Sequence, residues 1–381
     1  MRKMKLIALK DVCKINMGQS PNSSSYNDYG DGMPFFQGNA DFGERYPITR
    51  VWCNTPTKIA QAEDILISVR APIGALNYAK EECCIGRGLA AITPDRNKVS
   101  QDFIYWALKG KKAELNDKGN GSTFKAISRK ILEETMIPDI NFEQQHKCAE
   151  NLEKIYGIIQ NRRKELLALD DLIKARFVEM FGSPVSNPMS WEKRTLKEVC
   201  IKLNDGSHFS PESFETGDYK YVTAKNIKFS GFDFSNITYV PEAVHRPIFD
   251  RCNPEFEDVL YIKDGATTGV AIVNTLDEEF TLLSSVALLK QDRSIMNGYF
   301  LATLLNNKDM YLNIRNNMGG AAITRLTIAK LNAIEIIVPP IELQNQFAAF
   351  VAEVDKSKVA VQKALDETQT LFDSLMQEYF G

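Results

Sequence analysis

The sequence predicts an α+β protein in which two tandem, pseudo-symmetric modules are separated by a long antiparallel two-helix coiled coil. Three observations support this prediction. The chain of 381 residues repeats its landmarks in the same order about 200 residues apart. Each repeat ends in a stretch of roughly 40 residues whose apolar side chains alternate at three- and four-residue spacing. The segments in between mix short β-like and helical runs without the regular alternation of a doubly wound sheet.

Four landmarks define the repeat. Leu-Lys-Asp/Glu-Val-Cys, Glu-Asp-Ile/Val-Leu, Ile/Val-Pro and Glu-x-Phe-Gly occur at 9–13 and 196–200, 63–66 and 257–260, 137–138 and 338–339, and 179–182 and 378–381. A duplicated chain tends to form a pseudo-two-fold object, which suits ligands of matching symmetry. Duplex DNA with two half-sites is one such ligand.

The two long helical stretches keep strict register with each other. Their seam positions stand at a constant offset of 199 residues: Leu152, Ile155, Ile159, Arg162, Leu166, Leu169, Ile173, Arg176 and Met180 in the first, and Val351, Val354, Lys358, Val361, Leu365, Thr368, Phe372, Leu375 and Tyr379 in the second. A helix of roughly 55–60 Å has too little globular structure around it to bury such a stripe, so we expect the two to pair antiparallel. The alternative is that each helix packs on its own module or on another protein.

These patterns set the expected boundaries. Modules are expected over 1–141 and 190–340, helices over 142–182 and 341–381, and a linker rich in turn formers over 183–189. Inside the modules, 65–69, 271–274 and 282–289 read as strands and 101–112 and 298–307 as helices.

Composition narrows the class of protein. With 44% hydrophobic and 25% charged residues, the chain has the make-up of a globular protein. It contains no apolar stretch long enough for a signal peptide or a membrane span, so a cytoplasmic location is expected. Its seven cysteines form no CxxC pair, which favours free thiols over a metal site. A net charge of −3 permits DNA binding without arguing for it.

Motifs for catalysis are missing from the sequence. There is no GxxxxGK[ST] loop for ATP, no glycine-rich loop after a strand for adenosylmethionine and no Asn/Asp-Pro-Pro-Tyr turn. Glu63-Asp64 recurs as Glu257-Asp258, which allows an acid–base pair, but both pairs precede an apolar strand and a turn at the strand entry is favoured. The three histidines have no counterparts in the opposite repeat. The chain is therefore interpreted as a binding protein that holds no cofactor or metal of its own.

Several stretches carry a family resemblance. They are 64–74 followed by 84–94, and Ile137-Pro138 leading into Gln144-Gln145, matched by Val338-Pro339-Pro340 leading into 344–346. With the two modules and two helices, they resemble the specificity subunit of type I restriction–modification enzymes, whose modules are target recognition domains. The second module departs from the pattern, since 258–265 replaces the Arg-Ala-Pro motif and Ser284-Ser285 stands where 86–88 reads Gly-Arg-Gly.

The resemblance implies a noncatalytic subunit that reads a bipartite site in double-stranded DNA, one half per target recognition domain, with the coiled coil setting the spacer. It implies two methyltransferase subunits that use S-adenosylmethionine to methylate adenine N6, and it allows two restriction subunits that use ATP and Mg. Two alternatives from other classes remain open at this point. One is a stand-alone sequence-specific DNA-binding regulator, and the other is a scaffold protein with no nucleic-acid role.

The candidate DNA-binding residues lie on loops, where polar and cationic side chains can enter a groove or approach phosphate. They are Gln37, Asn39, Arg70, Arg87, Ser122 and Lys125 in the first module, and Thr223, Lys225, Asn226, Lys263, Thr267, Thr268, Thr324 and Arg325 in the second. The stretches 19–21 and 206–208 are weaker candidates. For each group a structural role is the alternative: a hairpin turn with local side-chain bonds, surface ion pairs, or a flexible connection.

Overall fold

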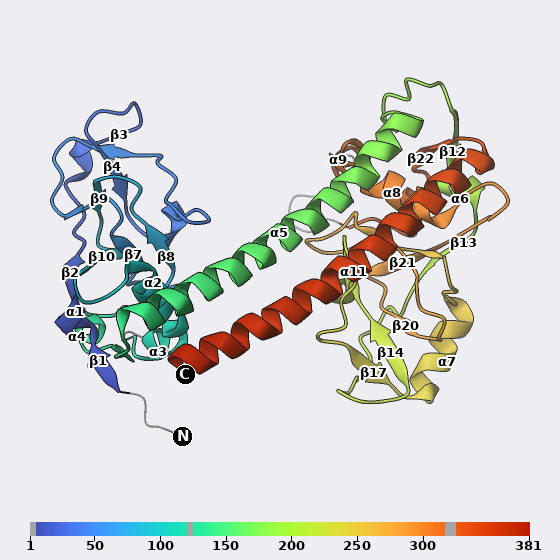
Figure 1. Cartoon of the computed structure of the whole chain (residues 1–381). Helices are drawn as coiled ribbons and strands as arrows, with labels where there is room; N and C mark the ends of the chain where they lie inside the picture. Colours follow the sequence, from blue (N-terminus) through green and yellow to red (C-terminus); the bar gives the residue numbers. More distant parts are fainter. Residues whose placement is uncertain (1–4, 120–124, 317–324) are drawn as a thin grey trace. The chain divides into compact units, whose positions relative to one another are not determined.

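The computed structural model describes residues 5–119, 125–316 and 325–381. The chain divides into two compact units, one made of Met1–Arg163 with Lys363–Gly381 and the other of Lys164–Gln362. Each unit contains one of the two modules together with part of both long helices, α5 (Phe142–Phe181) and α11 (Ile341–Phe380) (Figure 1). Each compact unit therefore includes parts of the long helices, whereas the boundaries predicted from the sequence separate the helices from the modules.

The first module is built mainly from short strands. Its elements are β1 (Leu6–Ala8), α1 (Leu9–Val12), β2 (Cys13–Met17), η1 (Ser23–Ser25), β3 (Tyr26–Asn27), β4 (Met33–Phe36), η2 (Asn39–Asp41), β5 (Trp52–Cys53), β6 (Ile59–Ala60), β7 (Ile65–Ser68), β8 (Leu76–Tyr78), β9 (Cys83–Ile85), β10 (Leu89–Pro94), α2 (Gln101–Gly110), α3 (Lys112–Asp117), α4 (Arg129–Glu133) and β11 (Met136–Pro138).

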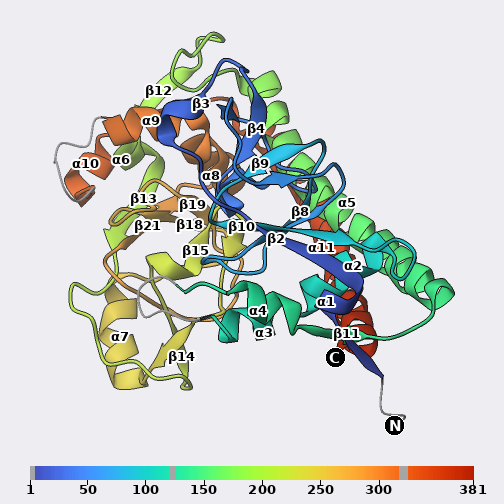
Figure 2. The same cartoon turned by 90° about the vertical axis from the view of Figure 1, so that its left-hand side faces the viewer.

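Three sheets organise this module. A four-stranded antiparallel sheet runs in the order β2-β10-β7-β8, a five-stranded sheet in the order β3-β5-β4-β9-β6, and β1 pairs with β11. Figures 1 and 2 show β3, β4 and β9 at one end of the module and α1, α2 and β11 at the other, beside the start of α5. The described strands and helices confirm the predicted mixture of helix and sheet.

The second module repeats the plan with a longer chain. Its elements are β12 (Glu192–Thr195), α6 (Leu196–Val199), β13 (Cys200–Asp205), β14 (Tyr219–Val222), η3 (Ala224–Asn226), β15 (Ile227–Lys228), β16 (Gly231–Phe232), β17 (Thr238–Val240), α7 (Glu242–Arg251), β18 (Val259–Ile262), β19 (Ala271–Val273), β20 (Thr281–Leu282), β21 (Val286–Gln291), α8 (Gly298–Asn306), α9 (Lys308–Asn316), α10 (Ile328–Asn332) and β22 (Glu335–Val338).

The order of its main sheet, β13-β21-β18-β19, matches β2-β10-β7-β8 strand for strand, and β12 pairs with β22 as β1 pairs with β11. The first landmark of the repeat forms the same short helix in both modules, α1 and α6, with its leucine and valine buried. The pseudo-symmetry predicted from the sequence is therefore present in the fold of the modules.

Two predicted elements are each divided in two. The strand expected over 282–289 is two strands, β20 and β21, because Ser284 and Ser285 form a turn between them. The helix expected over 101–112 stops at Gly110, and α3 begins at Lys112. All seven cysteines are free, and burial raises the pKa of both Cys13 and Cys200 to about 12.

The two long helices pair antiparallel within each unit. In the first unit Asn151 on α5 contacts Tyr379 on α11, and Arg162 bonds to the carbonyl of Ala364 and the hydroxyl of Thr368. In the second unit Lys358 Nζ lies 2.8 Å from Asp170 Oδ1, and the Phe177 and Phe347 rings are 5.6 Å apart. The partner number falls as the α5 number rises, which confirms the predicted antiparallel pairing.

The polar seam residues have defined partners. Arg162 meets Thr368 and Lys358 meets Asp170 across the two helices. Arg176 pairs with Glu179 on its own helix, and its guanidinium carbon lies 5.9 Å from the Phe350 ring centroid on α11. All eighteen predicted seam positions are buried or half-buried. Polar seam contacts of this kind fix the register of a coiled coil at some cost in stability.

The Glu-x-Phe-Gly landmark has a structural explanation that the sequence did not suggest. Phe181, at the end of α5, packs on Phe300 of α8 with ring centroids 4.8 Å apart, and Phe380, at the end of α11, packs on Phe103 of α2 at 5.5 Å. Each helix therefore ends in the core of the module that it does not follow in sequence. Both phenylalanines are buried.

The glutamines after the Ile/Val-Pro landmark hold the start of the long helices. The buried Gln145 accepts a hydrogen bond from Ser100 N at 2.7 Å and donates one to Ile140 O. Gln344, also buried, accepts from Asn297 N at 2.9 Å and donates to Pro339 O. In each module one buried amide thus joins the start of the first core helix to the start of the long helix.

Candidate nucleic-acid interface

Three loops that are far apart in the sequence meet at one edge of the first module. Gly86 N donates to Phe36 O at 2.8 Å, Gly88 N to Gln37 O at 3.1 Å, and Gly18 N to Leu89 O at 2.9 Å. The backbones approach so closely that a Cβ atom at Gly88 would lie 2.4 Å from Gln37 O, and one at Gly18 2.2 Å from Gly86 O. Glycine is required at both positions for this reason.

The same edge continues through backbone bonds to two further candidates. Val69 N donates to Gly88 O at 2.9 Å, and Ile127 N donates to Val69 O at 2.9 Å, which sets Arg70 beside Lys125 and Ala126. We call the residues 18–20, 37–39, 69–71, 86–88 and 125–126 the first loop edge. It brings together Gln37, Asn39, Arg70, Arg87 and Lys125.

The cationic side chains of the first loop edge are exposed to solvent. Arg70, Arg87 and Lys125 are exposed, and their charged groups make no hydrogen bond or ion pair with any residue that the structure describes. Gln37 is exposed too, and its backbone N–H is held by Asp41 Oδ2 at 2.7 Å, so the turn is preformed while the side-chain amide remains accessible. Exposed guanidinium, ammonium and amide groups are the donors that contact phosphates and base edges.

The second module builds the corresponding edge with the same hydrogen-bond pattern. Leu283 N donates to Val222 O, Lys263 N to Ser285 O and Leu326 N to Lys263 O, at 3.0, 2.9 and 2.8 Å. Ser207 N donates to Leu282 O at 2.7 Å. We call the residues 206–209, 222–225, 263–267, 283–285 and 325 the second loop edge. It brings together Thr223, Lys225, Lys263, Thr267 and Arg325.

Three of the candidate side chains are internal in the second module. Asn226 accepts from Thr223 N at 3.0 Å and Thr268 donates to Gly265 O at 2.6 Å, while Lys263 is only 2% exposed. In this structure the three side chains are bonded within their own module rather than displayed at the surface. Ser122 and Thr324 lie outside the described residues.

Sequence reasoning also missed two carboxylates, Asp205 and Asp264. Both contact Lys263, and the residues at the corresponding places in the first module are Met17 and Arg70. A comparison of the repeats would have found the signal. Met17 and Val69 in the first module become Asp205 and Lys263 in the second, so two neighbouring apolar positions change to opposite charges together.

The repeated Glu-Asp pairs form turns. Glu63 and Glu257 have φ of 71° and 68°, and Asp64 and Asp258 accept hydrogen bonds from Gln61 N and Glu255 N at 2.9 and 2.8 Å. Burial raises the pKa of both aspartates above the ordinary value. Each pair shapes the entry to a core strand, β7 or β18, as the favoured interpretation predicted.

Among the described residues, no group of three or more His, Cys, Asp or Glu side chains is placed to hold a metal ion. No helix within the described ranges is both long enough and apolar enough to cross a membrane.

Each module gathers polar and cationic loops at one edge, an arrangement that suits a protein binding a polar ligand. A family model described as the type I restriction modification DNA specificity domain matches residues 1–168 and 188–368. The chain belongs to this family and contains two such domains. The family predicted from the sequence is confirmed, and DNA specificity, rather than catalysis, is the role that membership assigns to the chain.

Individual relatives agree with the family assignment. The "Putative type I restriction enzyme MjaX specificity subunit" of Methanocaldococcus jannaschii is 47% identical over 152 residues, which cover 40% of this chain and 36% of that protein. The type I restriction enzyme MjaIX specificity subunit of the same organism is 24% identical over 400 residues, which cover 97% of this chain and 90% of that protein. The chain thus spans about a third of the first relative and nearly all of the second.

A solved structure supports the fold over the whole chain. The S subunit of a type I restriction-modification system from M. genitalium matches with a TM-score of 0.63 at 16% identity, covering 100% of this chain and 97% of that one. At this identity the likeness concerns the fold. It confirms the architecture of mixed modules with long helices.

Proposed function

We propose that the chain reads a bipartite site in double-stranded DNA, with each module recognising one half through its loop edge. The observation that carries this proposal is the repeated hydrogen-bond pattern of the two edges, which presents different side chains on the same backbone. A similar backbone places the readers in a similar way, and different side chains read different bases. An asymmetric site with two unlike halves is the expected ligand.

The paired helices are proposed to set the distance between the two halves. Each helix contains 40 residues, which corresponds to about 60 Å at 1.5 Å per residue, whereas one turn of B-DNA is about 34 Å. The contacts of Arg162 with Thr368 and of Lys358 with Asp170 would lock the register, and the register would determine the spacer.

The chemistry on DNA is proposed to come from partner subunits. Two methyltransferase subunits would dock on this chain and methylate adenine N6 with S-adenosylmethionine, and two restriction subunits using ATP and Mg would complete the complex where they exist. Partners would also supply positive charge that a chain of net charge −3 lacks, since phosphate contacts dominate affinity for DNA. The assembled complex is expected in the cytoplasm.

Single-molecule methylation mapping of the source genome, with and without the gene for this chain, tests the proposal. The expected result is one split adenine-methylation motif that disappears with the gene. Absence of any motif that depends on the chain would refute it. Specific binding by the isolated chain, without methylation in the cell, would favour the stand-alone regulator instead.

The helix proposal has a separate test. Deleting four residues from α5 and the four matching residues from α11 should change the spacer of the motif while each half keeps its sequence. The control is a set of exposed α5 substitutions, such as Lys154→Ala, that leave helix length intact. An active deletion variant with the original spacer would contradict the proposal.

A further inference from the structure

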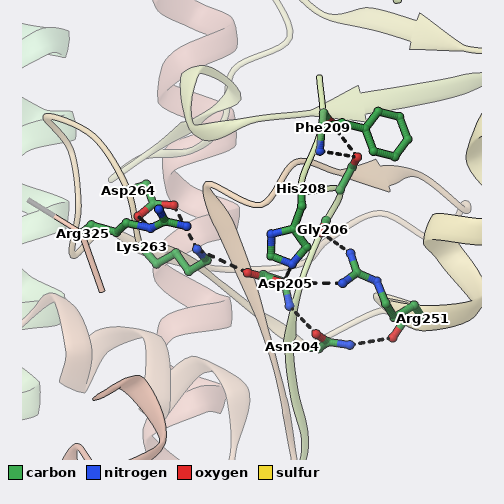
Figure 3. Close-up of polar contacts among 10 residues, drawn as sticks. Asn204, Asp205, Gly206, His208, Phe209, Arg251, Lys263, Asp264 and Arg325 are labelled. Atoms are coloured by element: carbon green, nitrogen blue, oxygen red, sulfur yellow. Dashed lines mark hydrogen bonds and ion pairs between the residues drawn. The ribbon is translucent and has the colours of Figure 1, made fainter. Parts of the chain in front are cut away.

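An ion-pair network crosses the second loop edge and includes two of the candidate residues, Lys263 and Arg325 (Figure 3). Lys263 Nζ lies 3.3 Å from Asp205 Oδ2 and 2.9 Å from Asp264 Oδ2, and Asp264 Oδ1 lies 3.4 Å from Arg325 Nε. Lys263 and Asp205 are only 2% and 3% exposed. The network thus runs from a buried lysine–aspartate pair to an exposed arginine at the surface.

At its other end the network holds the loop that follows β13. Asp205 Oδ1 lies 3.2 Å from His208 Nε2 and 3.9 Å from Arg251 Nη1, and Arg251 Nη2 donates to Gly206 O. The network therefore links the C-terminal ends of the strands β13 and β18 and of the helix α7 to Arg325.

The loop held in this way displays an aromatic ring. Ser207 Oγ donates to Phe209 O at 2.6 Å and accepts from Phe209 N at 3.3 Å, which fixes the Phe209 backbone. Its side chain is 64% exposed, and Figure 3 shows the ring directed away from Asp205. An exposed phenylalanine on a fixed loop beside cations has the character of the apolar wedges that enter base steps.

The first module shows that this fold does not need the buried ion pair. Met17 pairs with Ala90 as Asp205 pairs with Ala287, and Val69 N donates to Gly88 O as Lys263 N donates to Ser285 O. Two apolar residues therefore occupy the places of the ion pair in the first module. Because a buried ion pair often adds little stability compared with an apolar pair, its presence in one module alone points to a role in positioning.

We infer that Asp205, Lys263 and Asp264 are positioning residues that hold Arg325 and the Phe209 loop in place for recognition of the second half-site. This inference rests on the proposed function. The three buried or half-buried residues touch no base themselves. They act by limiting the conformations of the two groups that do.

The decisive variant installs the residues of the first module, as Asp205→Met with Lys263→Val, in the full-length chain. It replaces the chromosomal copy, and single-molecule methylation mapping reads the resulting motif. We expect unchanged protein level and unfolding temperature, an unchanged first half, and at least a tenfold loss of discrimination at one or more positions of the second half. Arg325→Ala should give a weaker loss confined to the same half.

Matched controls separate positioning from general damage. Arg293→Ala removes an exposed cation paired with Glu257 at the opposite end of β18, and it should leave both halves of the motif intact. Lys263→Val alone removes the buried ammonium beside Asp205, which is itself buried, and should lower the unfolding temperature. Asp264→Asn keeps the shape of the side chain and tests the network where the double variant fails to fold.

The outcomes separate failure of the positioning role from failure of the proposed function. An unchanged second half in the double variant, or an equal loss in both halves, would overturn the positioning role. Where the double variant does not fold, an unchanged second half in Asp264→Asn would overturn it. A wild-type chain that yields no split motif would refute the proposed function instead, so the two failures are distinguishable.

Discussion

The two loop edges share a backbone but balance their charges differently. In the first, Arg70, Arg87 and Lys125 are exposed and form no ion pair with any described residue. In the second, Lys263 and Arg325 are paired with Asp205 and Asp264. Duplication thus preserved the scaffold, and divergence changed the electrostatics at the place where recognition is proposed. The first edge therefore displays unpaired cations, whereas Lys263 and Arg325 of the second edge are held by carboxylates.

The largest expected effect tests what the modules have in common. Phe181→Ala should lower the stability of the second unit, and Phe380→Ala that of the first, each by about 3–5 kcal/mol, because both rings are buried in a module core. Calorimetry of the full chain measures the two transitions. Val178→Ala, on the exposed side of α5, is the control and should leave both transitions near wild type. Wild-type stability in either phenylalanine variant would show that the modules differ in their cores as well.

The next largest effect tests a difference between the two edges, the close backbone approach at Gly88. Gly88→Ala places a Cβ atom 2.4 Å from Gln37 O and should cost about 1–3 kcal/mol while weakening first-half recognition. Its counterpart in the second module is Ser285, which already carries a Cβ atom, so Ser285→Ala should be tolerated. Thermal unfolding together with motif mapping checks both variants. Equal effects of the two substitutions would mean that the backbone is packed equally closely around Gly88 and Ser285.

The seam positions of the long helices could be predicted because they depend only on the spacing of apolar residues within one segment. The constant offset of 199 residues predicted every seam position, and the antiparallel pairing followed from the length of an unpartnered apolar stripe. The contacts of Phe181 and Phe380 with the opposite modules could not be predicted in the same way. The Glu-x-Phe-Gly landmark marks the end of each repeat but carries no signal for the partner.

The loop edges were predicted in part. Arg70, Arg87, Gln37 and Lys125 were chosen by residue type, and the structure brings them together through strand register that the sequence does not display. Lys263 was chosen by residue type as well, but register places Asp264, and not Lys263, opposite Arg325, as Arg70 lies opposite Ala126. Lys263 is buried because Asp205 accompanies it from 58 positions away. Exposure of a charged side chain depends on such distant partners, which residue type alone does not reveal.

A smaller effect sharpens the electrostatic contrast. Each cation of the first edge that contacts a phosphate should contribute about 0.9 to the slope of log K against log salt, so Arg70→Ala and Arg87→Ala should each reduce that slope. Arg325→Ala should reduce it less, because Asp264 already balances the guanidinium group. Fluorescence anisotropy of the assembled complex on a duplex carrying the mapped motif gives the slopes. Arg96→Ala, which removes an exposed cation paired with Glu63, is the control. Equal slopes for all variants would remove the proposed difference between the edges.

The smallest effect compares the two modules at one position, where the first has the titratable Lys109 and the second has Asn306. Lys109 Nζ lies 3.8 Å from the Tyr156 ring centroid and 4.8 Å from that of Trp106, and burial, reinforced by Arg45, lowers its pKa to about 8. Asn306 holds the corresponding place in the second module and bonds to the backbone of Ala271. Because the unfolded state binds more protons between pH 8 and the ordinary lysine value of 10.5, the contribution of Lys109 to stability rises with pH in this window, by at most about 1.4 kcal/mol per pH unit.

Chemical unfolding of wild type and Lys109→Met from pH 7.5 to 9.5 measures this contribution as a difference. The wild-type free energy of unfolding should gain on the variant as the pH rises. The thiols of Cys13 and Cys83, whose pKa values burial raises to about 12, act in the opposite sense in both proteins and cancel in the comparison. Asn306→Ala carries no titrating group and should change stability equally at every pH. A difference between wild type and Lys109→Met that stays flat across the range would show that the lysine keeps an ordinary pKa, with its ammonium stabilised by the surrounding rings as well as by water.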